Sequence, residues 1–163
     1  MTRAGPFLAL ALAACAGTRA PDDAAEPPAA AASADTVRGT LQATGSEPAV
    51  TFVVVDAAGR GTPLEGDRGF LRRLEGLEVA VRGVRRPDAL QVQDVAVRGA
   101  NGVPAVDGVL VREGAGYALR MADGGRRPIA RLPEGLRGAV GARVWLAGRL
   151  DGDVDSFGIV GPP

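Results

Sequence analysis

One strand pattern occurs twice in this sequence, and it constrains the fold more than any other feature. In Gly76–Gly83, the apolar residues at 77, 79 and 81 alternate with Glu, Ala and Arg, and a glycine stands at each end. Such alternation is typical of a β-strand with one buried face. Residues 141–148 repeat the arrangement, again between two glycines. The sequence therefore predicts a small β unit that is used twice.

The segments around the two stretches also follow one order. Pro63 predicts an edge position for its strand because proline cannot donate to a central ladder. The alternation slips at Asp94, which predicts a β-bulge there. A helical spacing of apolar residues covers 69–75. Alternation and turn residues predict further strands at 37–41, 49–55, 63–65 and 90–97 in the first copy, and at 106–110, 117–121 and 128–129 in the second.

Identical residues recur in register between the two copies. They occur in predicted turns, in predicted core positions and at strand ends, so they support a duplication. The pairs are Pro63 and Pro128, Leu71 and Leu136, Arg72 and Arg137, Gly76 and Gly141, Val79 and Val144, Gly83 and Gly148, Asp88 and Asp153, and Val95 and Val160.

Each copy thus contains three strands, a short helical connection and two more strands. This order resembles the OB-fold, a five-stranded Greek-key barrel. The resemblance implies an all-β protein with short helices and two tandem small barrels, at residues 36–99 and 104–163, joined by a linker at 99–104. SH3-like barrels or one merged β-sheet are the alternatives. A unit of about 60 residues is marginal alone, so the two units are expected to bury surface against each other.

The N-terminus has the features of an export signal. Arg3 precedes an apolar stretch at residues 6–14 that is too short to span a bilayer, and this stretch leads into Leu12-Ala13-Ala14-Cys15. That tetrapeptide resembles the lipobox of bacterial lipoproteins. The resemblance implies that the signal peptide, residues 1–14, is removed and that Cys15 carries a diacylglyceryl group. It also implies a membrane anchor, because two or three acyl chains hold a protein stably.

Residues 15–35 are predicted to form a disordered tether behind the lipidated Cys15. Alanine, proline and acidic residues dominate this segment, and it has no large apolar side chain to bury. The residue after the cysteine is Ala16 rather than aspartate. By resemblance to lipoprotein sorting in enteric bacteria, this predicts the outer membrane, with the protein facing the periplasm.

Composition excludes several kinds of chemistry. The chain contains no histidine, which rules out Ser-His-Asp triads, Cys-His pairs and histidine-ligated metals. The serines at 33, 46 and 156 do not lie in a nucleophile elbow, and no glycine motif for phosphates is present. We therefore expect no enzymatic activity and no cofactor.

Charge also argues against nucleic acid as a partner. Basic and acidic residues number 19 each. The strongest basic cluster, Arg72, Arg73, Arg82, Arg85 and Arg86, is interleaved with carboxylates. Single-stranded nucleic acid is bound by basic grooves with stacking aromatic residues. Here alternation predicts that the aromatic residues Phe52, Tyr117 and Phe157 face inward.

Two neighbouring residues are the candidate interaction site. Trp145 is out of phase with the apolar residues on either side of it, Arg143 lies on the same face, and the first copy has Ala80 where the second has Trp145. An outward tryptophan beside an arginine can anchor a partner. The alternative is that Trp145 packs against the first unit as part of the contact between the units.

A weak calcium candidate lies near the C-terminus. Asp151, Asp153 and Asp155 have the spacing of the first carboxylates in a calcium loop, but Ser156 and Pro162 stand where glycine and glutamate belong. A solvated acidic turn is the simpler interpretation, and no metal is expected.

These expectations together predict a non-catalytic lipoprotein of the cell envelope. It would act as a surface module that binds an envelope protein or a glycan. A small-ligand or glycan binder and a calcium-stabilised β module are the alternatives. The sequence does not name the ligand.

Overall fold

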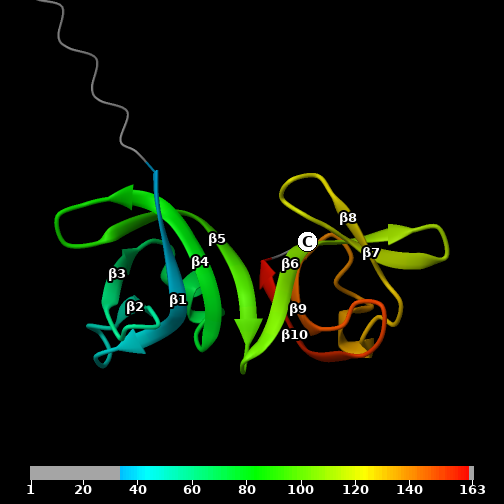
Figure 1. Cartoon of the computed structure of the whole chain (residues 1–163), viewed down its shortest axis with the longest axis horizontal. Helices are drawn as coiled ribbons and strands as arrows, with labels where there is room; N and C mark the ends of the chain where they lie inside the picture. Colours follow the sequence, from blue (N-terminus) through cyan, green and yellow to red (C-terminus); the bar gives the residue numbers. More distant parts are fainter. Residues whose placement is uncertain (1–33, 162–163) are drawn as a thin grey trace, which may run out of the picture. The chain divides into compact units, whose positions relative to one another are not determined.

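The structure, a computed structural model, describes residues 34–161. The predicted all-β fold is confirmed, because strands dominate this range (Figure 1). The regular helical segments in the described range are α1 (Arg68–Arg72) and one 3-10 turn, η1 (Glu134–Leu136). The strands are β1 (Ala34–Thr44), β2 (Thr51–Val55), β3 (Gly61–Glu65), β4 (Leu77–Arg85), β5 (Leu90–Ala100), β6 (Val103–Glu113), β7 (Gly116–Arg120), β8 (Arg126–Ile129), β9 (Arg143–Gly148) and β10 (Val154–Gly161).

The predicted signal peptide and the lipidated Cys15 lie outside the described residues, as does the tether up to residue 33. Ala34 and Asp35, which were assigned to the tether, form the start of β1 and pair with β4. The folded part therefore begins slightly earlier than the sequence predicts.

Strands β1 to β5 close into a barrel, here called the first barrel. Antiparallel pairs join β1 to β2 and β4, β2 to β3, and β4 to β5. A short parallel pair, Leu64 opposite Leu90, joins β3 to β5 and completes the ring. The order β1-β2-β3-β5-β4-β1, with α1 between β3 and β4, is that of an OB-fold. The predicted edge position of Pro63 is wrong, because β3 has neighbours on both sides; the ladder with β5 begins at Leu64, just after the proline.

Strands β6 to β10 repeat this order but do not close, and they are called the second barrel. β6 pairs with β7 and β9, β7 pairs with β8, and β9 pairs with β10. Within the described residues, no strand ladder joins β8 to β10. A single backbone hydrogen bond of 2.8 Å, from Ala130 N to Leu150 O, bridges the gap at one end. The second barrel therefore has an open side that the first barrel lacks.

Equivalent glycines have equivalent contacts in the two barrels. Gly76 and Gly141, which precede the repeated strand, both have positive φ, at 80° and 93°. Their amides donate 2.8 Å hydrogen bonds to Leu41 O and Leu110 O, which are matching positions in β1 and β6. A left-handed backbone is easily adopted only by glycine. This agreement in backbone geometry supports the duplication that the sequence predicts.

The sequence offset between the two copies changes before the last strand of each barrel. Val81 in β4 lies opposite Val95, whereas the matching Leu146 in β9 lies opposite Phe157. Phe157 is therefore the structural counterpart of Val95, and the sequence match of Val95 with Val160 is wrong. A shorter hairpin causes the slip, because Gly83 lies opposite Val92 whereas its match Gly148 lies opposite Val154; the bulges fall at matching positions in both ladders. The bulge predicted at Asp94 is confirmed to within one residue, since the ladder with β4 skips residue 93.

The segment predicted as a linker is a β-hairpin. Gly99 pairs with Pro104 and Ala100 with Val103, so β5 runs directly into β6. Asn101 and Gly102 form the turn, with φ of 53° and 75°. Positive φ at both central residues is the geometry for which Asn-Gly is favoured. Because this pairing joins the two barrels, all ten strands of residues 34–161 belong to one continuous sheet.

Two apolar clusters fill the barrels. Both interiors follow from the alternation of apolar residues along the strands. One cluster surrounds Leu41, Val81 and Leu71 of the first barrel, and it extends to Ala105, Ala147 and Val160 of the second. The other surrounds Leu110, Leu136 and Leu146 inside the second barrel. The first cluster therefore also includes the contact between the barrels.

Candidate interaction site

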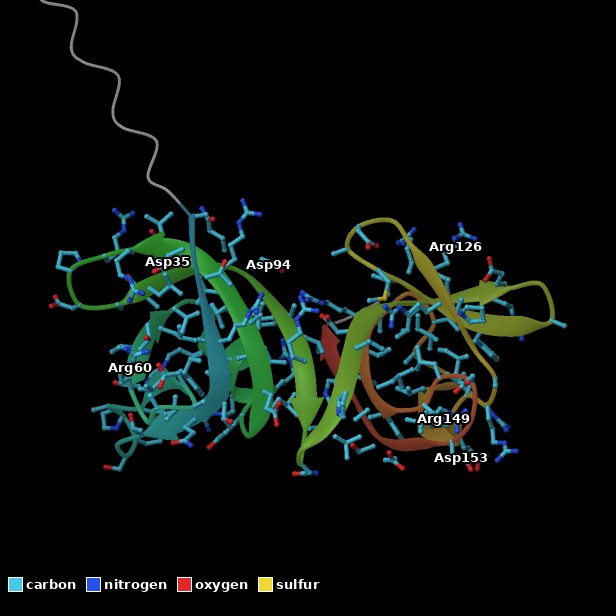
Figure 2. All side chains as sticks on the ribbon, viewed as in Figure 1. Asp35, Arg60, Asp94, Arg126, Arg149 and Asp153 are labelled. Atoms are coloured by element: carbon cyan, nitrogen blue, oxygen red, sulfur yellow. The ribbon has the colours of Figure 1, made fainter. Side chains whose placement is uncertain are left out.

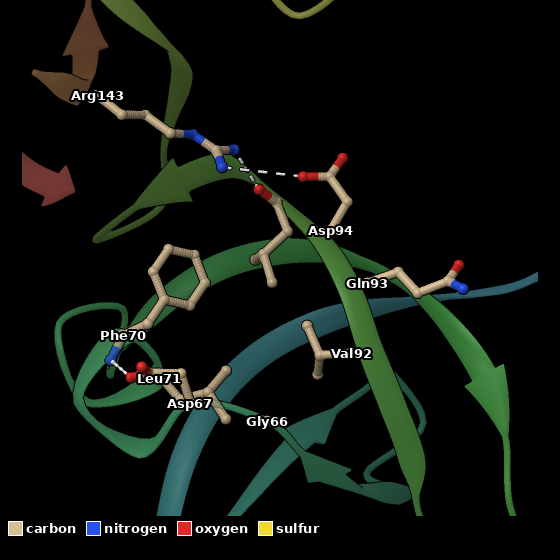
Figure 3. Close-up of a pocket in the computed structure, with 9 residues that line it drawn as sticks. Gly66, Asp67, Phe70, Leu71, Val92, Gln93, Asp94 and Arg143 are labelled. Carbon is tan, nitrogen blue, oxygen red and sulfur yellow. Dashed lines mark hydrogen bonds and ion pairs between the residues drawn. The ribbon is translucent and has the colours of Figure 1, made fainter. Parts of the chain in front are cut away.

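Arg143 joins three strands through its guanidinium group, and Figure 3 shows its contacts with β5. From β9, its Nε donates a 2.9 Å hydrogen bond to Asp107 on β6, and a terminal nitrogen donates both to Asp107 and to the Val95 carbonyl on β5. Its other terminal nitrogen lies 3.8 Å from Asp94, also on β5. The Asp107 side chain is only 10% exposed. Arg143 therefore links the first barrel to the second.

Trp145 lies on the same face of β9 as Arg143 and is half-buried. It packs against the apolar cluster that spans the first barrel and the contact between the barrels. On β10 it lies opposite Gly158, where an added Cβ would come within 2.6 Å of the indole nitrogen. The two residues predicted as an interaction site thus make contacts within the chain, as the alternative for Trp145 foresaw. Both side chains are only partly exposed.

A cavity of about 200 Å³ lies beside the Arg143 contact. The Asp67 carboxylate accepts a 2.6 Å hydrogen bond from Phe70 N, and this bond caps the start of α1. The Asp94 carboxylate faces Arg143 (Figure 3). Both carboxylates of the cavity are thus already engaged within the chain. The lining residues are Gly66, Asp67, Phe70, Leu71, Val92, Gln93, Asp94, Val95 and Arg143.

The acidic turn near the C-terminus is held by arginines. Both carboxylate oxygens of Asp151 accept hydrogen bonds of 3.1 Å from Arg149, and this contact lowers the pKa of Asp151. Asp153, which is labelled close to Arg149 in Figure 2, pairs with Arg131 at 2.5 Å. Across residues 34–161, no three acidic side chains converge as a metal site would require. The geometry therefore does not favour the calcium alternative.

The arginine cluster forms a mixed surface with its neighbours. Arg72 pairs with Glu47 at 2.5 Å, and Arg85 pairs with Asp35 at 2.6 Å. Arg73 donates to the Val160 carbonyl, and Arg86 donates to Gln91. Exposed pairs of this kind contribute little to stability, but they do neutralise the surface.

A larger groove of about 450 Å³ lies at the end of the first barrel, beside two Arg–Asp pairs. Asp56 accepts hydrogen bonds of 2.9 Å from Ala58 N, Arg60 N and Arg60 Nε, and these contacts with Arg60 lower its pKa. The hydrogen bond from Arg85 likewise lowers the pKa of Asp35. Both carboxylates therefore stay ionised below the usual range and hold the groove's arginines in place.

The Asp56 turn makes the stability of the protein depend on pH. Because the pKa of Asp56 is lowered on folding from its ordinary value of 3.8, its contribution is fully present above pH 3.8 and is lost as pH falls through the folded value. We expect Asp56→Asn to be less stable than the parent chain at pH 6 and equally stable at the lowest pH that retains the fold. Urea unfolding at both pH values measures this difference. Asp88→Asn, which removes a turn charge elsewhere, is the control; a gap for Asp56→Asn that is independent of pH would contradict the prediction.

The surface feature that sequence reasoning missed lies on β10. Phe157 and Ile159 are 41% and 47% exposed, and Val140, after η1, is 41% exposed. They are the exposed large apolar side chains of the described range. Phe157 was predicted to face inward and to be buried, and the prediction of burial is wrong. The side chain lies on the barrel face of β10 beside Gly135, but the second barrel is open on this side and leaves 41% of it exposed. Phe52 is buried as predicted, and Tyr117 is half-buried.

The comparisons with known proteins add no family. No protein-family model matches the chain, and neither a curated protein nor a solved structure matches it. Among residues 34–161, no helix has the length and apolar character needed to cross a membrane.

Proposed function

We propose that this chain is a non-catalytic interaction module of the bacterial cell envelope, anchored through lipids on Cys15. The anchor is supported by the lipobox-like Leu12-Ala13-Ala14-Cys15 sequence, which contains the chain's single cysteine. The interaction is supported by one observation above all: Phe157 and Ile159 are exposed on the same face of β10, a strand that pairs on one side only. Exposed apolar patches on otherwise covered domains mark binding surfaces.

The state of the carboxylates supports a non-catalytic role. A general acid needs a raised pKa near the working pH. The pKa values of Asp35, Asp56 and Asp151 are instead lowered, because each carboxylate holds an arginine. The chain has no histidine to serve in their place.

The small-ligand or glycan alternative stays a prediction. A bound ligand stabilises the folded state by mass action. Cell-wall fragments that raise the melting temperature, where unrelated sugars do not, would favour this alternative over a protein partner.

Replacing the predicted lipidation site tests the anchor. We expect Cys15→Ser to move the protein from the detergent-extracted membrane fraction to the soluble fraction, because the thioether that carries the lipid cannot form. Cell fractionation and mass spectrometry of the mature N-terminus measure this change. Thr18→Ala, in the same segment, should leave the protein in the membrane. A Cys15→Ser protein that still needs detergent for extraction would contradict the anchor.

A photo-cross-linking residue tests the binding surface in the intact, anchored protein. Placed at Phe157, it should yield adducts in cells because the patch contacts a partner. Placed at Arg98, which is exposed on β5, it should yield none. Equal labelling from both positions, or none from Phe157, would refute the proposed surface.

A further inference from the structure

The outer edge of β10 is an unpaired strand edge. Among the described strands, β10 bonds only to β9. Its counterpart β5 bonds to β4 along its length, to β3 near its start and to β6 at its end. In the second barrel, one hydrogen bond between Ala130 and Leu150 replaces the ladder that would cover this side. The backbone groups along this edge are therefore placed to accept another strand.

The middle of this edge carries little of the usual protection against pairing. Natural edge strands carry lysine, arginine, proline or inward charges that block a second chain. Val154–Ile159 contains none of the first three; its single charge is Asp155, and the register of β10 against β9 shifts at Asp155 and again at Val160. The one side-chain hydrogen bond to this strand's backbone comes from Arg73, whose Nε lies 2.9 Å from Val160 O. Between the two register shifts, residues 156–159 therefore carry no charge, and Phe157 and Ile159 are the exposed apolar side chains there.

We infer that a second copy of this chain pairs with β10 in antiparallel orientation, across a two-fold axis at Gly158. This inference rests on the proposed function, because it names the partner of the same apolar patch. A two-fold axis through the sheet places residues of one face opposite each other. An axis at Gly158 sets each Phe157 against the second copy's Ile159, within the regular stretch between the register shifts at Asp155 and Val160. An axis at Asp155 would instead oppose two carboxylates, which is destabilising.

The net charge of the chain does not oppose self-association. Basic and acidic residues are equal at 19 each, and the formal net charge is zero. A net charge far from zero keeps copies of a protein apart, and this chain has none. The two-fold contact uses the free edge of both copies, so the assembly stops at a dimer rather than growing into a filament.

The anchor makes a small contact sufficient. A strand edge with two apolar side chains buries less than the roughly 1,000 Å² of a stable solution interface. Acyl chains on both copies would confine them to one membrane plane, which raises their effective concentration. The dimer is therefore weak in solution and strengthened at the membrane.

Sedimentation of the full chain carrying Cys15→Ser tests the contact without interference from lipids. The average mass should rise from one chain toward two with increasing concentration. Adding Ile159→Asp or Phe157→Asp should hold the mass at one chain at every concentration, while circular dichroism and Trp145 emission verify the fold. Val140→Asp, equally apolar and exposed but outside β10, should still dimerise. Equal loss in the Val140 variant would overturn strand pairing.

Cysteine cross-linking tests the register, because Cys15→Ser leaves a background without cysteine. Chains with Phe157→Cys mixed with chains with Ile159→Cys should form a disulfide-linked dimer under mild oxidation, whereas each alone should not. A chain that stays monomeric at all concentrations, with no mixed disulfide, overturns the second copy as the partner. If the chain is monomeric, photo-adducts at Phe157 whose mass is not that of two chains would still support the proposed function, with a different partner. The absence of adducts at Phe157 would overturn the proposed function too.

Discussion

Gly39→Ala is expected to cost the protein about 3 kcal/mol of unfolding free energy, near the upper end for overpacking. A Cβ at Gly39 would overlap the carbonyl oxygen of Val55 and lie 2.6 Å from its carbonyl carbon. These are backbone atoms of the paired strand β2, so no side chain can move to relieve the contact. The first barrel must distort to accept a methyl group. A loss of this size lowers the melting temperature by roughly 10 °C in a domain of this length.

The matching glycine of the second barrel allows the effect of Gly39→Ala to be compared with that of a less crowded position. Gly108 is the match of Gly39 in the second barrel, and its added Cβ would lie 2.7 Å from Arg120 O. Gly108→Ala should therefore destabilise the protein too, but less than Gly39→Ala. Gly138→Ala is the control, because nothing lies within 4 Å of its added Cβ. Thermal and urea unfolding rank the three variants; a Gly39 variant as stable as the Gly138 variant would refute the close approach.

Arg143→Ala is expected to lose about 2–3 kcal/mol, because it leaves a nearly buried carboxylate without its partner. Asp107 is 10% exposed and accepts two hydrogen bonds from Arg143. The Val95 carbonyl on β5 loses its donor as well. The figure is below that of a fully buried pair, because the Arg143 side chain is itself 31% exposed. Trp145 emission should shift to the red as the contact between the barrels loosens.

Two further variants distinguish the effect of losing the Arg143–Asp107 contact from the effect of losing any surface charge. Arg137→Ala should change stability by less than about 0.5 kcal/mol, since Arg137 lies 3.9 Å from Glu134 and both side chains are largely exposed. Asp107→Asn combined with Arg143→Ala should cost less than the sum of the single losses, because the two residues act on one contact. Equal losses from Arg137→Ala and Arg143→Ala would show that Arg143 does not join the barrels.

Most of the fold could be predicted from local sequence. The strand at Gly76–Gly83, its repeat at residues 141–148 and the helical segment before the first copy follow from alternation and spacing within a few residues. The hairpin at Asn101-Gly102 was predictable too, since Asn-Gly between apolar runs is a strong turn signal. It was instead interpreted as a linker.

The candidate site was only partly predictable. Sequence reasoning singled out Trp145 because it breaks the match with Ala80 of the first copy, and Arg143 because it lies beside Trp145. It also weighed the packing of Trp145 against the first unit. The sequence does not decide whether these two side chains face solvent or pack within the protein, because their surroundings depend on which barrel lies against β9. Phe157 and Ile159 were missed because inward alternation predicts burial only when the barrel closes.

By itself, then, the sequence determined the all-β class, the duplicated order of strands, and the glycines on which both copies depend. These properties rest on alternation, turn chemistry and steric demands, each of which acts within a few residues or across one strand pair. Tertiary structure alone decided that Arg143 and Trp145 join the barrels and that the second barrel stays open. Both depend on pairing between strands far apart in the chain, where a missing ladder changes which side chains are covered.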